Sequence, residues 1–178
     1  MRFLRSRRRE AITNYKKRVA MLKSGIPRVV VRKSNRQITA QLIGYKENGD
    51  IVLASANSKE LKGMGWEPRS NMPTAYLTGM LLAKKAKKLA EKGCTLDIGL
   101  ARPVKNSVVF AAAKGSQDGG LSIRFNAEID ANRIKGAHIA RYAAMKHQAQ
   151  QFTHYAKAGF DVAKIGDTFE TVKKKILE

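Results

Sequence analysis

Apolar and polar residues alternate along three consecutive stretches near the start of the chain, which is the pattern of half-buried β-strands. The first runs from 27 to 34, and after a turn at Asn35-Arg36 the second begins at Ile38. The third, from 51 to 56, follows Asn48-Gly49, a dipeptide typical of tight hairpin turns. We therefore expect three antiparallel strands, whose core faces carry Val29, Val31, Ile38, Ala40 and Leu42.

Apolar residues at helical spacing precede these strands. The segment Arg5–Ser24 is predicted to be one amphipathic helix, because Gly25 and Pro27 follow it and end helices. Its apolar stripe is narrow and its other faces are mostly basic. The stripe expected to anchor it consists of Ile12, Tyr15, Val19 and Leu22.

A longer helix is predicted from 72 to 92, after a polar connection at 57–70. The short apolar stretch 95–100 then indicates a buried strand, and 107–114 a further helix ending before Gly119-Gly120. The element order β-β-β-α-β-α predicts an α/β (α+β) fold, a mixed sheet with helices packed on it.

The last third of the chain has weaker helical spacing. We expect three regions: a basic N-terminal arm and helix at 1–25, a globular core at 26–125 and a helical extension at 126–178. A final helix is predicted near Asp167, which with Glu170 resembles a capping box. Its apolar stripe would be Phe169, Val172 and Ile176.

The distribution of charge along the sequence gives the first indication of function. Thirteen of the first 36 residues are Arg or Lys, and Glu10 is the only acid among them. This block carries more than half of the net charge of +21. Like charges repel and destabilise a compact state, so such a density indicates a polyanionic partner, most commonly a nucleic acid.

Other classes are less favoured by the composition. The single cysteine, Cys94, excludes an internal disulfide and a Cys-based zinc site, and it suits a reducing cytosol. The longest uncharged stretch, 70–83, is too short for a membrane span. The Arg-rich start could mimic a transit peptide, but Glu10 and its continuation into a helical pattern argue against that.

Catalytic chemistry has little support in the sequence. The strand order is reminiscent of ribonuclease H-like folds, but those enzymes need several converging carboxylates, and Asp97 is the only acid in a predicted strand. The stretch 115–120 lacks a phosphate-cradling pattern, and the histidine spacings match no common metal site. The three histidines are His138, His147 and His154. We therefore expect that the protein is not an enzyme and has no cofactor or small-molecule substrate.

Several residues have two interpretations. Tyr15 and Tyr76 could stack on bases, but their positions on apolar stripes favour core packing. Trp66, in a connection beside Arg69, could equally stack on RNA. Five lysines of the long helix could bind RNA or form its solvated side: Lys84, Lys85, Lys87, Lys88 and Lys92.

Five segments, in order, resemble one known family. They are Arg7-Arg8-Arg9-Glu10 leading to Thr13-Asn14-Tyr15 and Arg18; Arg32-Lys33-Ser34-Asn35; Asn71 to Gly79; Leu96-Asp97-Ile98-Gly99-Leu100; and Asp118 to Ile123. Together they resemble universal large-subunit ribosomal protein 18, the 5S rRNA-binding family, in its archaeal form. The resemblance implies a cytoplasmic, structural protein of the large subunit's central protuberance, with 5S rRNA, large-subunit rRNA and neighbouring ribosomal proteins as partners.

In that family the N-terminal arm and the polar face of the hairpin contact 5S rRNA, which agrees with the charge distribution. The alternative is a non-specific basic nucleic-acid-binding protein or RNA chaperone, which would share the charge but need no particular target. In either case the residues expected to bind RNA are Arg2, Arg5, Arg7, Arg8, Arg9, Asn14, Lys16, Lys17, Arg18, Lys23, Arg28, Arg32, Lys33, Ser34, Asn35, Arg36, Gln37, Thr39, Gln41, Trp66, Arg69, Asn71, Arg133, Lys135, His138 and Arg141.

Overall fold

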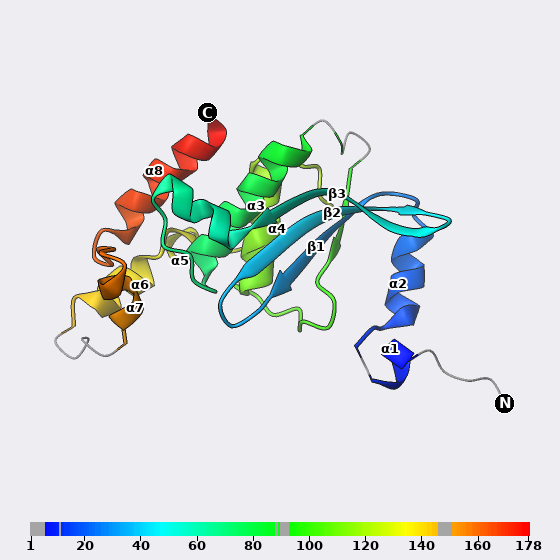
Figure 1. The fold of residues 1–178 in the computed structure, drawn as a ribbon, viewed down its shortest axis with the longest axis horizontal. Coiled ribbons are helices and arrows are strands. Elements are labelled where there is room, and N and C mark those ends of the chain that lie inside the picture. The colour runs from blue at the N-terminus through cyan, green and yellow to red at the C-terminus, as the bar shows by residue number, and fades with distance from the viewer. Residues whose placement is uncertain (1–5, 11, 88, 90–92, 146–150) are drawn as a thin grey trace.

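A computed structural model describes residues 6–10, 12–87, 89, 93–145 and 151–178 (Figure 1). Its elements are α1 (Ser6–Arg9), α2 (Tyr15–Leu22), β1 (Arg28–Lys33), β2 (Ile38–Lys46), β3 (Gly49–Asn57), the 3-10 helix η1 (Ser58–Met64), α3 (Met72–Ala86), β4 (Thr95–Asp97), α4 (Val108–Asp118), α5 (Ala131–Lys135), α6 (Ala137–Ala143), α7 (Thr153–Lys157) and α8 (Ile165–Leu177).

The four strands form one sheet in the order β3-β2-β1-β4. β1 and β2 are antiparallel, as are β2 and β3, whereas the short β4 runs parallel to β1. The hairpin between β2 and β3 turns at Gly49, whose φ of +132° suits glycine. The predicted mixed sheet, its three antiparallel strands and the β-β-β-α-β-α order of the core are confirmed.

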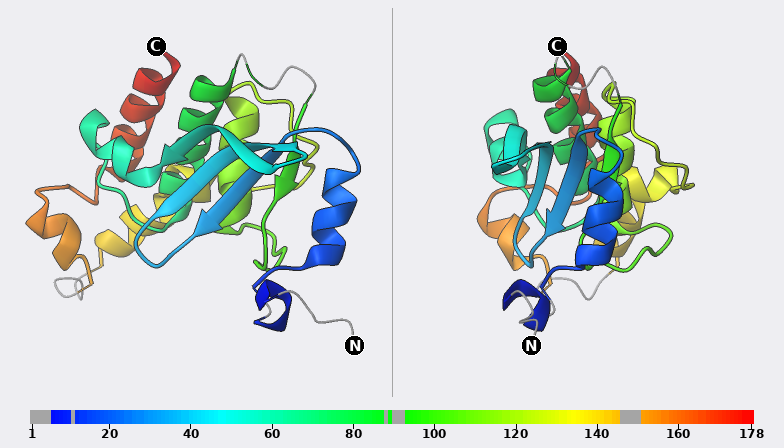
Figure 2. Two further views of the ribbon diagram at one scale, coloured as in Figure 1. Left: turned by 45° about the vertical axis from the view of Figure 1, so that its right-hand side comes forward. Right: turned by 90° about the vertical axis from the view of Figure 1, so that its right-hand side faces the viewer.

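Two helices cover one face of this sheet (Figure 2). The core faces of β1 and β2 are fully buried against α3 and α4, as the alternating pattern predicts. The two helices lie in close contact, since a Cβ atom added at Gly79 would lie 2.0 Å from the carbonyl oxygen of Ala112. Glycine therefore permits the helix crossing that closes the core.

The predicted helix over 5–24 is wrong as a single element. It is two short helices, α1 and α2, and Asn14 begins the second by accepting a hydrogen bond from the Lys17 amide at 3.1 Å. No residue of α2 is buried, and Ile12 and Val19 are 48% and 50% exposed. The predicted anchoring stripe is therefore only partly confirmed, since Tyr15 and Leu22 are half-buried whereas Ile12 and Val19 are exposed.

Two further boundaries differ from the prediction. α3 ends at Ala86 rather than at 92, and Lys88 with residues 90–92 falls outside the described residues. β4 ends at Asp97 because the chain turns at Gly99, whose amide donates to Asp97 Oδ1 at 2.8 Å. The connection 57–70 also contains η1, which a capping box between Asn57 and Glu60 begins.

The C-terminal segment forms α5 to α8 beside α3. The buried stripe of α8 is confirmed, with Phe169, Val172 and Ile176 each 1% exposed. Its predicted capping box is wrong, because α8 begins at Ile165 and has no side-chain cap. Within the described ranges, no helix is long and apolar enough to cross a membrane.

Candidate nucleic-acid interface

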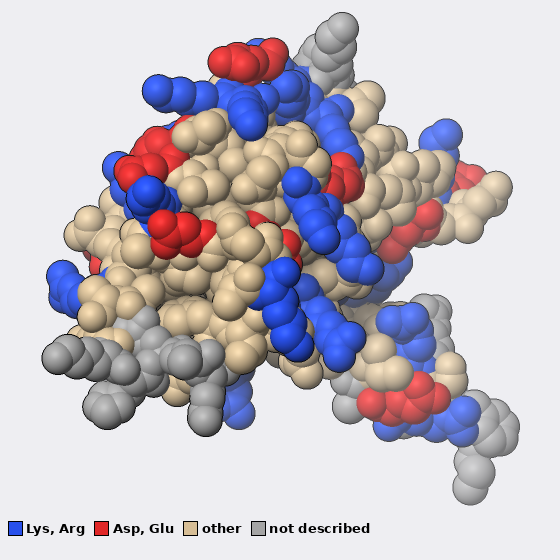
Figure 3. All heavy atoms as spheres, turned by 60° about the vertical axis from the view of Figure 1, so that its left-hand side comes forward, with Lys and Arg blue, Asp and Glu red and all other residues tan. Residues whose placement is uncertain are grey.

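Positive charge lies at two ends of the molecule. α1 and α2 lie at one end, and α5, α6 and α7 at the other (Figure 1). The face drawn in Figure 3 shows Lys and Arg side chains gathered in clusters, with Asp and Glu side chains beside several of them. A surface of this kind can bind an extended polyanion such as RNA.

The N-terminal end presents its cations to solvent. Lys16, Lys17 and Lys23 of the α2 region are exposed, and the described residues give them no carboxylate partner. Arg7 donates from Nε to Thr13 Oγ1 at 3.0 Å, which ties α1 to the start of α2, and Arg9 is exposed. Arg2, Arg5 and the side chain of Arg8 lie outside the described residues.

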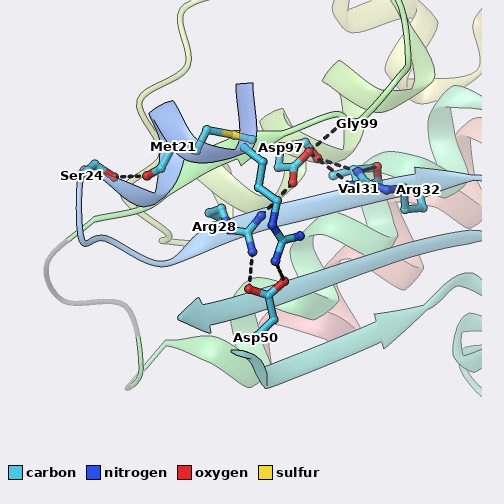
Figure 4. Close-up of polar contacts among 9 residues, drawn as sticks. Met21, Ser24, Arg28, Val31, Arg32, Asp50, Asp97 and Gly99 are labelled. Carbon is cyan, nitrogen blue, oxygen red and sulfur yellow. Dashed lines mark hydrogen bonds and ion pairs between the residues drawn. The ribbon is translucent and has the colours of Figure 1, made fainter. Parts of the chain in front are cut away.

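A row of alternating charges joins α2 to the sheet (Figure 4). Arg18 lies 2.6 Å from Asp50, and Asp50 lies 2.9 Å from Arg28. Arg28 also lies 3.2 Å from Asp97, which lies 3.3 Å from Arg32. The two carboxylates thus hold the guanidinium groups in fixed positions.

Burial would raise the pKa of the Asp50 carboxyl, but the hydrogen bond from Arg18 and the charge of Arg28 outweigh it. The pKa of Asp50 is therefore below its ordinary value. The carboxylate stays charged at neutral pH and keeps its two arginine partners.

Arg28 cannot bind RNA directly, which corrects the prediction for this residue. It is 2% exposed and lies between Asp50 and Asp97, so it is a structural cation beneath the surface. Its Nε is buried without a hydrogen-bond acceptor among the described residues. Arg32, by contrast, is 50% exposed in its side chain and remains available.

The turn between β1 and β2 carries a second group of cations. The hydroxyl of Ser34 closes the turn by accepting from the Gln37 amide at 3.1 Å and donating to the Gln37 carbonyl at 3.0 Å. Lys33, Asn35 and Arg36 project from it into solvent. A hollow of about 460 Å³ beside the turn is lined in part by Lys59 of η1, a cation that strand patterning did not identify.

The polar face of β2 is half-buried and internally bonded. Thr39 accepts from Asn57 Nδ2 at 3.3 Å, and Gln41 donates to Ser55 at 3.4 Å. These side chains keep unused donor and acceptor capacity toward solvent. The structure therefore places the polar residues expected from the sequence on one accessible face.

Trp66 is not available for stacking on a base, which corrects a second prediction. It is 1% exposed, and its indole Nε1 donates to Thr74 Oγ1 at 2.9 Å. The ring packs against Phe160 and Phe169 at centroid distances of 5.6 and 6.2 Å. Tyr76 is also in the core, 3% exposed, as its position on the stripe predicted.

Arg69 and Asn71 have structural partners. Asn71 accepts from the Thr74 amide at 3.1 Å to begin α3, and its Nδ2 donates to the Tyr155 hydroxyl at 3.0 Å. The Arg69 guanidinium lies 5.6 Å from the centre of the Tyr155 ring and 3.6 Å from Glu67. Both residues are half-buried, so their roles here are mainly in joining α3 to α7.

The predicted C-terminal cations lie far from α2. Arg133, His138 and Arg141 are exposed, while Lys135 is paired with Glu170 at 3.1 Å. Burial and the nearby charge of Arg133 lower the pKa of His138. His138 is therefore neutral at neutral pH and can contribute hydrogen bonds rather than charge.

The described residues contain no group of three or more His, Cys, Asp or Glu that could hold a metal ion. Cys94 is fully buried, as predicted for a small structural residue. The features that sequence patterning missed are the two carboxylates Asp50 and Asp97, which organise the arginines. Their partners in the sheet register are Tyr45 and Val30, so strand pairing gives no signal of this role.

Comparison with known proteins gives a consistent result. Residues 2–93 match a family described as ribosomal large subunit proteins 60S L5, and 50S L18. Two similar proteins are each named large ribosomal subunit protein uL18. The one from Korarchaeum cryptofilum is 45% identical over 177 residues, covering 96% of this chain and 91% of that protein. The one from Methanococcus maripaludis is 43% identical over 179 residues, covering 96% and 93%.

Proposed function

This chain belongs to the family of large-subunit ribosomal proteins 60S L5 and 50S L18, and we propose that within the large subunit it binds 5S rRNA. Membership makes it a structural constituent of the cytoplasmic large ribosomal subunit and not an enzyme. We propose further that it lies in the central protuberance, where it attaches 5S rRNA to large-subunit rRNA and contacts neighbouring ribosomal proteins.

The observation that carries this proposal is the exposed cationic surface of α1 and α2. Its lysines have no carboxylate partners among the described residues, so their charge is available to phosphates. Lys and Arg that contact phosphates release counterions, and this release supplies most of the affinity. The surface accounts for affinity, but it does not by itself select an RNA.

Selectivity is assigned to the turn and the sheet. Asn35, Gln37 and Gln41 offer short polar contacts to sugars and base edges, and Lys33 and Arg36 lie beside them. Folded RNA is recognised mainly by shape, by 2′-hydroxyl contacts and by unpaired bases, so binding depends on the folded 5S rRNA. The C-terminal cations Arg133 and Arg141, at the other end of the molecule, are assigned to a second RNA contact.

A competition experiment tests the proposal. The labelled complex with an archaeal 5S rRNA transcript is challenged at moderate salt with unlabelled 5S rRNA, tRNA or duplex DNA. We expect 5S rRNA to displace the label at a concentration at least tenfold lower than the other two. Equal competition by all three would support a non-specific RNA chaperone instead.

The salt dependence of the same complex tests the role of the N-terminal arm. If the arm and α2 make about six phosphate contacts, the slope of log K against log salt is roughly −5 for duplex-like RNA. Deleting residues 2–9 should make that slope shallower. An unchanged slope would assign the main electrostatic contact elsewhere.

A further inference from the structure

A cavity of about 590 Å³ lies between α2 and β4, and it is large enough for a small-molecule-sized group. One wall is apolar and includes Met21, Leu96 and Ile98. Much of the remainder is cationic, with Lys17 and Arg32 among its side chains, and Asn14 and Asp97 also line it. A cavity with both apolar and cationic surfaces suits a ligand that has a flat apolar part and an anionic part.

Arg32 has an unusual orientation in this cavity. Its Nη1 donates to the carbonyls of Val31 and Asp97 at 2.9 and 3.0 Å, and Nη2 donates to Asp97 Oδ1 at 3.3 Å (Figure 4). These three hydrogen bonds are all made by N–H groups at the edge of the guanidinium. Arg32 is therefore poorly placed to clamp a phosphate through that edge.

Gly99 supports the guanidinium from one side. A Cβ atom added at Gly99 would lie 2.8 Å from Arg32 Cζ, and 3.0 and 3.1 Å from its two terminal nitrogens. Because Cζ is the nearest atom, the glycine lies over the flat face of the guanidinium and not at its edge. Gly99 also has a φ of +63°, so any other residue there would be both strained and in collision with Arg32.

Half of the Arg32 side chain is exposed and it lines the cavity, so the guanidinium keeps an accessible surface there. A planar guanidinium fixed at its edge and supported on one face is a stacking platform for a nucleobase. We propose that this cavity binds one unpaired nucleotide of the RNA, with its base stacked on Arg32 and its phosphate near Lys17. The proposal rests on the proposed RNA-binding function and names the chemical group that this site takes.

The variant Arg32→Lys tests the proposal, because lysine keeps the charge but lacks the plane. We expect binding of a 5S rRNA transcript to weaken by roughly 5- to 100-fold, the range for loss of one stacked base, with an unchanged salt slope. Chemical probing should show one unpaired nucleotide that the wild-type protein protects and the variant leaves reactive. The matched control is Arg124→Lys, at an exposed arginine outside the cavity, which should bind as the wild type does.

A second variant displaces the guanidinium without changing Arg32 itself, because the added Cβ would collide with it. Gly99→Ala should expose the same nucleotide, and combining it with Arg32→Lys should add little further loss, because both changes act on one contact. Gly63→Ala is the control, since a Cβ there would meet nothing within 4 Å. Circular dichroism establishes that each variant is folded.

The outcomes separate this proposal from the function on which it rests. Wild-type protein that fails to select 5S rRNA would overturn the proposed function. Selective wild-type binding with Arg32→Lys within twofold of it would overturn the stacking platform alone.

Discussion

The packing of α3 and α4 against the sheet differs sharply from the packing of α2. In the first region Leu77, Leu82 and Ala112 are 0% exposed, and the helix backbones approach so closely that glycine is required at Gly79. In the second, no side chain of α2 is buried, and hollows of about 860 and 590 Å³ border the helix. Stability is therefore carried by the core, whereas the proposed RNA-binding surface lies on a part of the chain that is loosely packed.

The two regions are held by different forces. Apolar burial stabilises the core at about 25 cal/mol for each Å² removed from water. α2 is joined to the sheet through the Arg18–Asp50 ion pair, and the mutual repulsion of its lysines opposes compaction. A surface whose charges repel one another would be stabilised by an RNA that neutralises them, as the proposed function requires.

Trp66→Ala should have the largest effect on stability. The residue is 1% exposed among aromatic rings, so its loss leaves a cavity and should cost about 3–5 kcal/mol in the free energy of unfolding. Denaturant unfolding followed by circular dichroism measures this. The control Tyr45→Ala, at a tyrosine that is 57% exposed, should change it by less than about 0.5 kcal/mol; equal costs would contradict the placement of Trp66 in the core.

Asp97→Asn should have the next largest effect. It removes one of the two carboxylates beside the buried Arg28 and the carboxylate partner of Arg32, and breaking a buried pair costs roughly 3 kcal/mol. The control is Glu47→Gln, at an exposed acid in the hairpin turn, with a change of less than about 0.5 kcal/mol expected. A loss no larger than that of the control would show that the row of charges is not a structural support.

A matched pair of valines compares the two regions directly. Val31→Ala removes a side chain that is 1% exposed and should cost about 2 kcal/mol. Val19→Ala makes the same chemical change in α2, where the side chain is 50% exposed, and should alter the free energy of unfolding by less than about 0.5 kcal/mol. Similar costs at both positions would mean that α2 belongs to the folded core.

The smallest expected effect is the contribution of Asp50 to the free energy of unfolding, which lowering the pH should remove. Its folded pKa lies below the ordinary value, so its stabilising contribution is complete above the ordinary aspartate pKa of about 3.9 and is lost as pH falls through the lower folded pKa. The stability difference between wild type and Asp50→Asn should therefore shrink as the pH is lowered from 5 to 3. A difference that stays constant over this range would contradict the ion-pair role.

The sheet could be predicted because its signals are local. Alternation around Val29 and Ile38 fixes which face is buried, and the turn at Gly49 fixes the hairpin. The single helix over 5–24 was wrong for a physical reason, since periodic spacing shows that a helix would be amphipathic but not that a surface exists to bury the whole of its stripe. Ile12 and Val19 have the right spacing and remain exposed.

The candidate site was predicted less completely, because its organisation depends on residues far apart in the sequence. Arg28 was expected to be accessible, yet Asp97, 69 positions later, lies beside it on a parallel strand. Trp66 was placed beside Arg69 in a loop, but its burial depends on Thr74 and Phe160. The exposed cations of α2 and of the turn needed no such partners, and sequence alone located them.

Cosedimentation tests the central claim most directly. An epitope-tagged copy of the chain is followed through sucrose gradients of archaeal ribosomes, before and after 5S rRNA is stripped from the large subunit. We predict that the chain sediments with large subunits and is released together with 5S rRNA, as one complex. A chain that stays on the subunit after 5S rRNA has left, or that never sediments with it, would contradict the proposed function.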